Sequence, residues 1–131
     1  MNLINLSGKQ IRVFSKESCV QTKKRIELID IFQEPILELE PSGLLRPYSN
    51  IEEKAVNGAP VVVQNYYAVD NPAGYIDQST DGVIVTNLYA SVARSLGLLD
   101  VQLFTVYRLV FAPSSGSSRS NVVGCLGFES K

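Results

Sequence analysis

Apolar residues recur at helical spacing in one stretch of this 131-residue chain, and elsewhere they mostly alternate with polar residues. Spacings of four, four and three residues put one apolar stripe on a helix, formed by Leu88, Val92, Leu96 and Leu99. Alternation with a period of two is typical of strands that bury one face. The chain is therefore restricted to folds in which a sheet dominates and one helix covers part of it.

The ends of that helix are marked by capping residues. Thr86 or Asn87 can act as the N-cap, because a short polar side chain accepts a hydrogen bond from the free amides of the first turn. Gly97 can close the helix, since glycine readily adopts a positive φ. The sequence predicts one principal helix over about residues 87–97, directly after a short strand at 82–85.

The rest of the chain reads as short strands and loops. Residues 3–15 predict two strands joined by a hairpin turn at Ser7, Gly8 and Lys9. Further strands are predicted at 25–32, 36–40, 60–69, 101–112 and 122–128. Ile36 is expected to point inward, and the two glycines of the last strand indicate a bulge or a close backbone approach. Residues 70–82 and 113–121 are expected to be loops.

Length and composition fit a single domain over residues 1–131. Apolar residues make up 45% of the chain and charged residues 19%, which suits a packed core. We therefore expect an α+β domain, with a mostly antiparallel sheet or small β-barrel and one principal helix.

Catalysis and metal binding have little support in the sequence. Histidine, the commonest general base and metal ligand, does not occur. Cys19 and Cys125 lie far apart and form no metal-binding motif, so we expect two free thiols rather than a zinc site or a disulfide. We expect a protein without catalytic residues, metal or cofactor.

Charge and hydropathy exclude two classes of partner. The net charge is −1, and a basic stripe of the kind that neutralises a phosphate backbone is missing, which argues against nucleic-acid binding. No apolar run has the length of a membrane span. The chain starts Met-Asn-Leu without a signal peptide, so a cytoplasmic protein is expected, in the host cytoplasm if a phage encodes it.

Four stretches together resemble a family of small bacteriophage, prophage and bacterial proteins. They are NLSGKQI (5–11), ELEPSGLLR (38–46), DGVIVTNLYASVARSL (81–96) and VVGCLGF (122–128). They are similar to the family's Asn-Leu-Thr-x-His-x-Ile opening, its Pro-Ser-Gly segment, its strand-then-helix element and its Gly-x-x-Gly-Phe ending. Lys9 stands where the family has histidine. The resemblance implies a viral or mobile-element origin and no particular activity.

The pattern Ser-Gly-x-x-Arg occurs twice, and each copy is a candidate anion site. A glycine turn can expose successive backbone N–H groups, and a serine hydroxyl and a guanidinium can complete a site for a phosphate or carboxylate. Alternatively, both stretches are ordinary turns that happen to end in arginine. The residues are Ser42, Gly43 and Arg46 in the first copy and Ser115, Gly116 and Arg119 in the second.

Other polar groups could join such a site. Thr86 and Asn87 lie at the helix start, where free N–H groups and the helix dipole attract anions, although both could serve only as caps. Tyr66 and Tyr67 must face opposite sides of their strand, so one of them, here taken as Tyr67, can line a ligand site or a subunit contact.

These observations favour a non-enzymatic, phage-type accessory protein that acts by binding. The first expectation is sequestration of an anionic small molecule, such as a nucleotide signal of host defence. The alternatives are docking onto a host or phage protein as an inhibitor or adaptor of the anti-defence type, and a minor virion or assembly component. A homo-oligomer suits all three, with association expected through a strand edge or the apolar face of residues 101–111.

Overall fold

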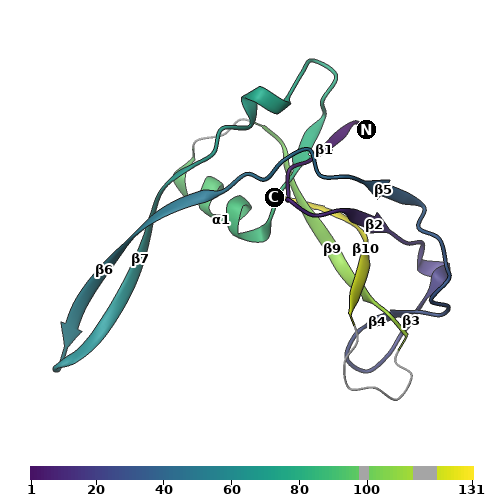
Figure 1. The fold of residues 1–131 in the computed structure, drawn as a ribbon, viewed down its shortest axis with the longest axis horizontal. Coiled ribbons are helices and arrows are strands. Elements are labelled where there is room, and N and C mark those ends of the chain that lie inside the picture. The colour runs from purple at the N-terminus through teal and green to yellow at the C-terminus, as the bar shows by residue number, and fades with distance from the viewer. Residues whose placement is uncertain (98–100, 114–120) are drawn as a thin grey trace.

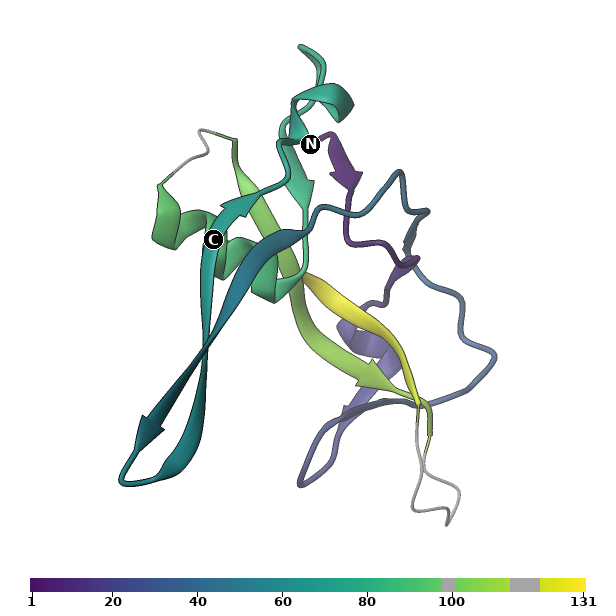
Figure 2. The ribbon, with the colours of Figure 1, turned by 60° about the vertical axis from the view of Figure 1, so that its left-hand side comes forward.

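The structure, a computed structural model, describes residues 1–97, 101–113 and 121–131. It consists of a body and an arm (Figure 1). The body holds an eight-stranded mixed sheet, and the arm is a separate two-stranded antiparallel ribbon. One α-helix, α1, lies beside the root of the arm and contacts both the arm and the sheet (Figures 1 and 2). The described part of the chain is thus mostly β with one α-helix, as the sequence predicted.

The strands of the body curl into a nearly closed, barrel-like sheet (Figure 2). Its hydrogen-bonded order is β1-β8-β9-β10-β2-β5, and β4 pairs with β9 and carries β3 on its other side. The bounds of these strands are β1 Leu3–Asn5, β2 Ile11–Val13, β3 Cys19–Gln21, β4 Ile26–Leu28, β5 Leu37–Leu39, β8 Gly82–Ile84, β9 Leu103–Phe111 and β10 Val122–Ser130. Two 3₁₀ turns, η1 (Lys16–Ser18) and η2 (Pro72–Tyr75), lie between strands.

Strand directions in the body are mixed. The pairs β1–β8, β8–β9, β4–β9 and β2–β10 are parallel, whereas β9–β10, β2–β5 and β3–β4 are antiparallel. Parallel neighbours need long connections, which alternation of apolar residues along one strand does not reveal. The fold therefore combines antiparallel hairpins with parallel pairs between distant parts of the chain.

The predicted hairpin over residues 3–15 is wrong. Gly8 does adopt a positive φ of 79°, but β1 and β2 pair with different neighbours, β8 on one side and β5 and β10 on the other. The buried side chain of Asn5 supports this turn, because its amide donates to the carbonyls of Lys9 (2.7 Å) and Leu39 (3.0 Å). A wide turn held by a side chain, rather than a tight hairpin, therefore separates the two strands.

Two other local expectations need correction. Ile36 does not point inward: it is exposed just before β5, and its amide donates to the Val13 carbonyl at 2.8 Å. The strand expected over 25–32 is only the three residues of β4, because residues 29–36 leave the sheet as an exposed loop. The strands predicted at 60–69, 101–112 and 122–128 are confirmed as β7, β9 and β10, and 70–82 is largely a loop.

Helix α1 spans Asn87–Leu96, within a residue of the prediction. Thr86 is its N-cap: the hydroxyl accepts a hydrogen bond from the Tyr89 amide at 3.1 Å. Gly97 ends the helix in the left-handed conformation, with φ of 63°. The inner face of α1 packs with β1, β8 and β9 in a core cluster formed by Leu6, Leu45, Val83, Val85, Tyr89, Ala90, Ala93 and Leu103. The helix therefore covers one end of the sheet.

Tyr89 is the largest side chain of that core and is 0% exposed. Its hydroxyl donates to the Asp70 carbonyl at 2.6 Å. Burial, with a smaller effect from the Asp70 charge, raises the pKa of Tyr89 to about 12. The folded state thus favours the neutral phenol, and this contribution to stability is complete below the unfolded pKa of about 10 and is lost as the pH rises through 12.

We expect the stability of the protein to fall between pH 10 and pH 12 partly through Tyr89. A shift of this size, from 10 to about 12, corresponds to roughly 3 kcal/mol of unfolding free energy. Tyr89→Phe should be less stable than the parent by about 1 kcal/mol at pH 8, because the Asp70 carbonyl loses its donor. The difference should shrink and then reverse by pH 12. Urea unfolding followed by circular dichroism at both pH values measures it, and a constant difference would contradict the assignment.

The arm consists of β6 (Pro47–Val56) and β7 (Ala59–Val69). The two-residue turn Asn57–Gly58 joins them, with φ of 52° and 81°, as in hairpins whose twist matches that of the strands. A register shift between Tyr48 and Ser49 marks a bulge at the root. The sequence interpretation contained β7 but not β6.

Both cysteines are free in the structure. Burial raises the pKa of both thiols, and Cys125 lies within the core. Across the described residues, no helix has the length and apolar character needed to cross a bilayer.

Candidate functional site

The first Ser-Gly-x-x-Arg stretch is not the glycine turn that the sequence predicted: it is an extended segment that rests on the body, and Leu44 forms an antiparallel bridge with Ser7. The Ser42 amide donates to the Asn5 carbonyl at 2.8 Å, and the Leu45 amide donates to the Leu6 carbonyl at 3.1 Å. Gly43 lies against the Tyr75 ring, so that a Cβ at this position would fall 2.7 Å from the Tyr75 hydroxyl oxygen. Two backbone donors of this stretch, the amides of Ser42 and Leu45, are therefore already used inside the protein.

A carboxylate occupies the position beside Arg46. The Arg46 amide donates to Asp70 Oδ2 at 2.8 Å, and the Tyr48 hydroxyl donates to Asp70 Oδ1 at 2.5 Å. The hydrogen bond to Asp70 is the largest cause of a raised pKa for Tyr48. Because Asp70 also binds Tyr89 of α1 through its carbonyl, this residue fixes the root of the arm to the helix.

The other predicted site residues are not gathered around Arg46. Thr86 caps α1, and Tyr67 is exposed on the arm strand β7. Asn87 lines a separate cavity of about 700 Å³ between α1 and the end of β10, with Ala90, Ser91, Arg94, Val106, Glu129 and Lys131. Ser115, Gly116 and Arg119 lie outside the described residues.

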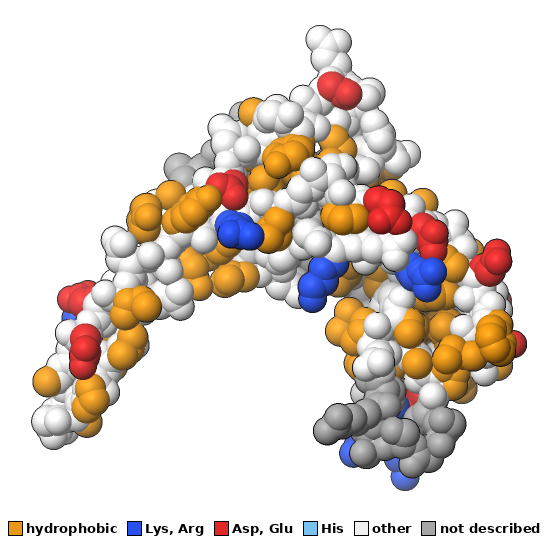
Figure 3. Space-filling model, viewed as in Figure 1, with side chains coloured by type: hydrophobic (Ala, Val, Ile, Leu, Met, Phe, Trp, Pro, Cys, Tyr) orange, Lys and Arg blue, Asp and Glu red, His pale blue; other side chains and the backbone are white. Residues whose placement is uncertain are grey.

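The arm is the most exposed regular element of the described chain. Every residue from 51 to 62 is exposed, although the stretch includes four large aliphatic side chains, Ile51, Val56, Val61 and Val62. The space-filling view shows both hydrophobic and charged side chains along the arm, and the arm stands clear of the body across an open concave side (Figure 3). Apolar surface of this kind, when it is contiguous, marks interaction sites.

The two faces of the arm differ in charge. Directly opposed residues of an antiparallel pair share a face, so the register puts Ile51, Glu53 and Ala55 with Gln64, Val62 and Pro60 on one face. We call this the outer arm face. The opposite face holds Glu52 and Lys54, whose carboxylate and Nζ lie 3.7 Å apart, and Val61. Ile51 and Val62 are 72% and 63% exposed, compared with 38% for Val61.

A second exposed apolar surface lies in the loop between β4 and β5. It contains Ile29, Ile31, Phe32 and Ile36. The Asp30 carboxylate accepts a hydrogen bond from the Phe32 amide at 2.9 Å, which shapes the loop locally. After the arm, this loop is the second candidate surface for contact with another protein.

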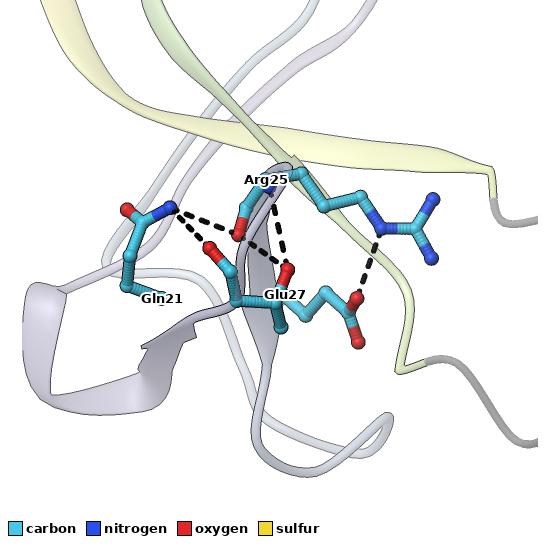
Figure 4. Close-up of polar contacts among 4 residues, drawn as sticks. Gln21, Arg25 and Glu27 are labelled. Carbon is cyan, nitrogen blue, oxygen red and sulfur yellow. Dashed lines mark hydrogen bonds and ion pairs between the residues drawn. The ribbon is translucent and has the colours of Figure 1, made fainter.

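A groove lies at the far side of the body from the arm, beside β3. The turn beside this groove, between β3 and β4, is held by hydrogen bonds among Gln21, Thr22 and Arg25 (Figure 4). Arg25 also pairs with Glu27 at 2.9 Å and lies over the Phe111 ring, 5.0 Å from its centre, which ties the turn to β9. The groove, here called the β3 groove, has a volume of about 260 Å³ and is lined by Lys16, Cys19, Val20, Gln21, Ile26, Arg108 and Leu126.

Sequence reasoning missed both the arm as a unit and the β3 groove. One signal could have found the arm: Asn57-Gly58 between two runs of strand-forming residues is a strong hairpin pattern. Nothing comparable marks the groove, because its lining comes from η1, β3, β4, β9 and β10.

We compared the chain with known protein families, curated proteins and solved structures. No protein-family model matches the chain, and no curated protein and no solved structure matches it. The resemblance to the phage, prophage and bacterial family stays a prediction. Within the described residues, no group of three or more Cys, Asp and Glu side chains is placed to hold a metal ion.

Proposed function

We propose that this protein is a non-catalytic accessory or assembly component that acts by docking onto protein through its β6–β7 arm. The observation that carries the proposal is that every residue from 51 to 62 is exposed, including the aliphatic side chains of Ile51 and Val62 on the outer arm face. Between residues 51 and 62 the two-stranded ribbon has no covered face and contributes little to the stability of the body, so the apolar side chains of this part have no role in the core. Two free strand edges add unpaired backbone groups that a partner can use.

The root of the arm supports the same function. Asp70 accepts hydrogen bonds from the Arg46 amide and the Tyr48 hydroxyl, and its carbonyl holds Tyr89 of the helix. An element fixed in this way loses little freedom on binding, which favours affinity. As for the kind of component, we propose one of phage or prophage origin, in line with the resemblance of its opening and ending.

Replacement of one arm residue tests the proposal. Ile51→Asp should remove the protein from its complex in cells that produce it, because a carboxylate in an apolar contact is strongly unfavourable. The matched control is Ile31→Asp, since Ile31 is similarly exposed at 62% but belongs to the loop after β4. Native mass spectrometry of the purified complexes measures the result. Loss of the complex with Ile31→Asp but not with Ile51→Asp would move the docking site to that loop.

Binding of an anionic small molecule is the second candidate. The cavity beside α1 favours it, because the cationic groups of Arg94 and Lys131 lie there with Asn87. Glu129 lies 3.6 Å from the Lys131 ammonium and reduces this positive charge. A thermal-shift screen with nucleotides separates the candidates: stabilisation that Arg94→Ala removes and Ile51→Asp leaves intact would favour the small molecule.

A further inference from the structure

The β3 groove has the size and lining of a site for side chains of another protein. Its volume of about 260 Å³ lies below the roughly 300–1,000 Å³ of pockets that hold small ligands. Val20 is an exposed apolar residue on its edge, and Ile26 and Leu126 are half-buried in its wall. One or two aliphatic side chains would cover this apolar surface.

The groove also carries uncompensated positive charge. Its two cationic residues are Lys16 and Arg108, and neither takes part in an ion pair within the described part of the chain. Arg108 has a φ of 54°, although it lies within β9 and is not glycine. Its guanidinium lies 5.4 Å from the centre of the Tyr107 ring, and its Nε donates to the Tyr107 hydroxyl at 2.9 Å. Such a backbone conformation is costly and is typical of functional positions.

The outer arm face has the complementary chemistry. Ile51 and Val62 present two aliphatic side chains, and Glu53, directly opposite Val62, places one carboxylate between them. Glu53 forms no ion pair among the residues that the structure describes, whereas Glu52 on the other face is paired with Lys54. Apolar surface with one negative charge on the arm thus matches apolar surface with two positive charges in the groove.

We propose that the outer arm face of one copy of this protein docks into the β3 groove of a second copy. This inference rests on the proposed function of the arm and names its partner. The arm cannot fill the groove of its own chain, because its tip stands apart from β3 and β4 in both views (Figures 1 and 2). Two different surfaces meet in such a contact, and each copy has one arm and one groove. The copies can therefore form a closed ring, or a dimer in which each arm binds the groove of the other copy.

Mixing of two variants tests this contact directly. Val62→Asp should inactivate the arm and Val20→Asp the groove, and each variant alone should self-associate at least about tenfold more weakly than the parent protein. An equimolar mixture should form a heterodimer, because it contains one intact arm and one intact groove. Val61→Asp is the matched control: this neighbouring valine faces the other side of the arm, so its variant should associate like the parent. Analytical ultracentrifugation measures the parent protein, the three variants and the mixture.

Folding of the variants is checked by circular dichroism, and Lys16→Glu replaces Val20→Asp as the groove variant if the latter unfolds. A parent protein that is monomeric up to about 100 µM, a range that covers even weak specific contacts, would overturn the inference. So would a mixture of arm and groove variants that stays monomeric, or equal losses in Val61→Asp and Val62→Asp. If one of these results is found but the arm binds a different protein in the native complex, this inference is wrong and the proposed function of the arm is supported.

Discussion

Asn5→Asp is expected to lower the free energy of unfolding by about 3–5 kcal/mol at pH 7. Asn5 is almost fully buried, and its amide uses both ends: Nδ2 donates to two carbonyls, whereas Oδ1 accepts from the Ser7 amide (3.1 Å) and hydroxyl (2.7 Å). Aspartate keeps the acceptor but sets a second oxygen against the carbonyls of Lys9 and Leu39. A buried charge then faces two partial negative charges.

The loss should be smaller in acid, because protonation of the new carboxyl restores one donor. Urea unfolding at pH 7 and pH 4.5 measures both effects. The matched control is Asn71→Asp, since the side-chain oxygen of Asn71 caps η2 by accepting from the Ala73 amide at 2.9 Å, and aspartate keeps that bond. Equal stability of the Asn5 and Asn71 variants at pH 7 would contradict the role given to the buried amide.

Gly124→Ala is expected to destabilise the protein by about 3 kcal/mol, at the upper end of overpacking effects. A Cβ at this position would collide with the Arg12 carbonyl oxygen and lie 2.6 Å from the Phe14 ring. Phe14 is buried in the core, and Arg12 belongs to β2, which is joined to β10 through a single registered pair, Val13 with Cys125. Neither neighbour can move without opening the junction between the two strands.

Gly127 of the same strand provides the control. A Cβ at this position meets no atom within 4 Å, so Gly127→Ala should match the parent protein or exceed its stability slightly. Thermal and urea unfolding of the two alanine variants compares them directly. If the Gly124 variant is as stable as the Gly127 variant, β2 and β10 can move apart to make room for the methyl group without loss of unfolding free energy, and the prediction is wrong.

The parts of the fold that depend on local signals were predictable from the sequence. The capping residues Thr86 and Gly97, with helical spacing between them, were enough to place α1. The predicted apolar stripe was only partly right, because Val92 is buried but Leu88 is 50% exposed, and Leu99 lies outside the described residues. The buried face is instead formed by Tyr89, Ala90, Val92 and Ala93. The pairing of β1 with β8 was not predictable, because nothing near Leu3 in sequence indicates that its partner is Gly82. Strand β6 was missed because hydrophobic alternation reports burial, and this strand is exposed on both faces.

The candidate site depends even more than the fold on contacts between residues that are far apart in the sequence. The sequence indicated a glycine turn at Ser42 and Gly43, but this segment is extended, and the amides of Ser42 and Leu45 donate to backbone carbonyls of the body. It gave no sign that Asp70 would lie against Arg46, twenty-four residues earlier. Charge and hydrogen-bond patterns of this kind arise only when the chain has folded, so composition and spacing alone cannot distinguish a ligand site from a supporting contact.

The connectivity of the strands also dictates an order of events during synthesis. The arm joins neighbouring residues through a two-residue turn, so it can form within microseconds once residue 69 is available. Strand β1 must wait for β8, and β2, which can pair with β5 earlier, must wait for its second neighbour, β10. A growing chain therefore presents a finished ribbon with exposed valines while its barrel is still open. This topology therefore favours aggregation during synthesis. Its main route is contact between the ribbons of nascent copies on neighbouring ribosomes, rather than slow pairing of strands within one chain.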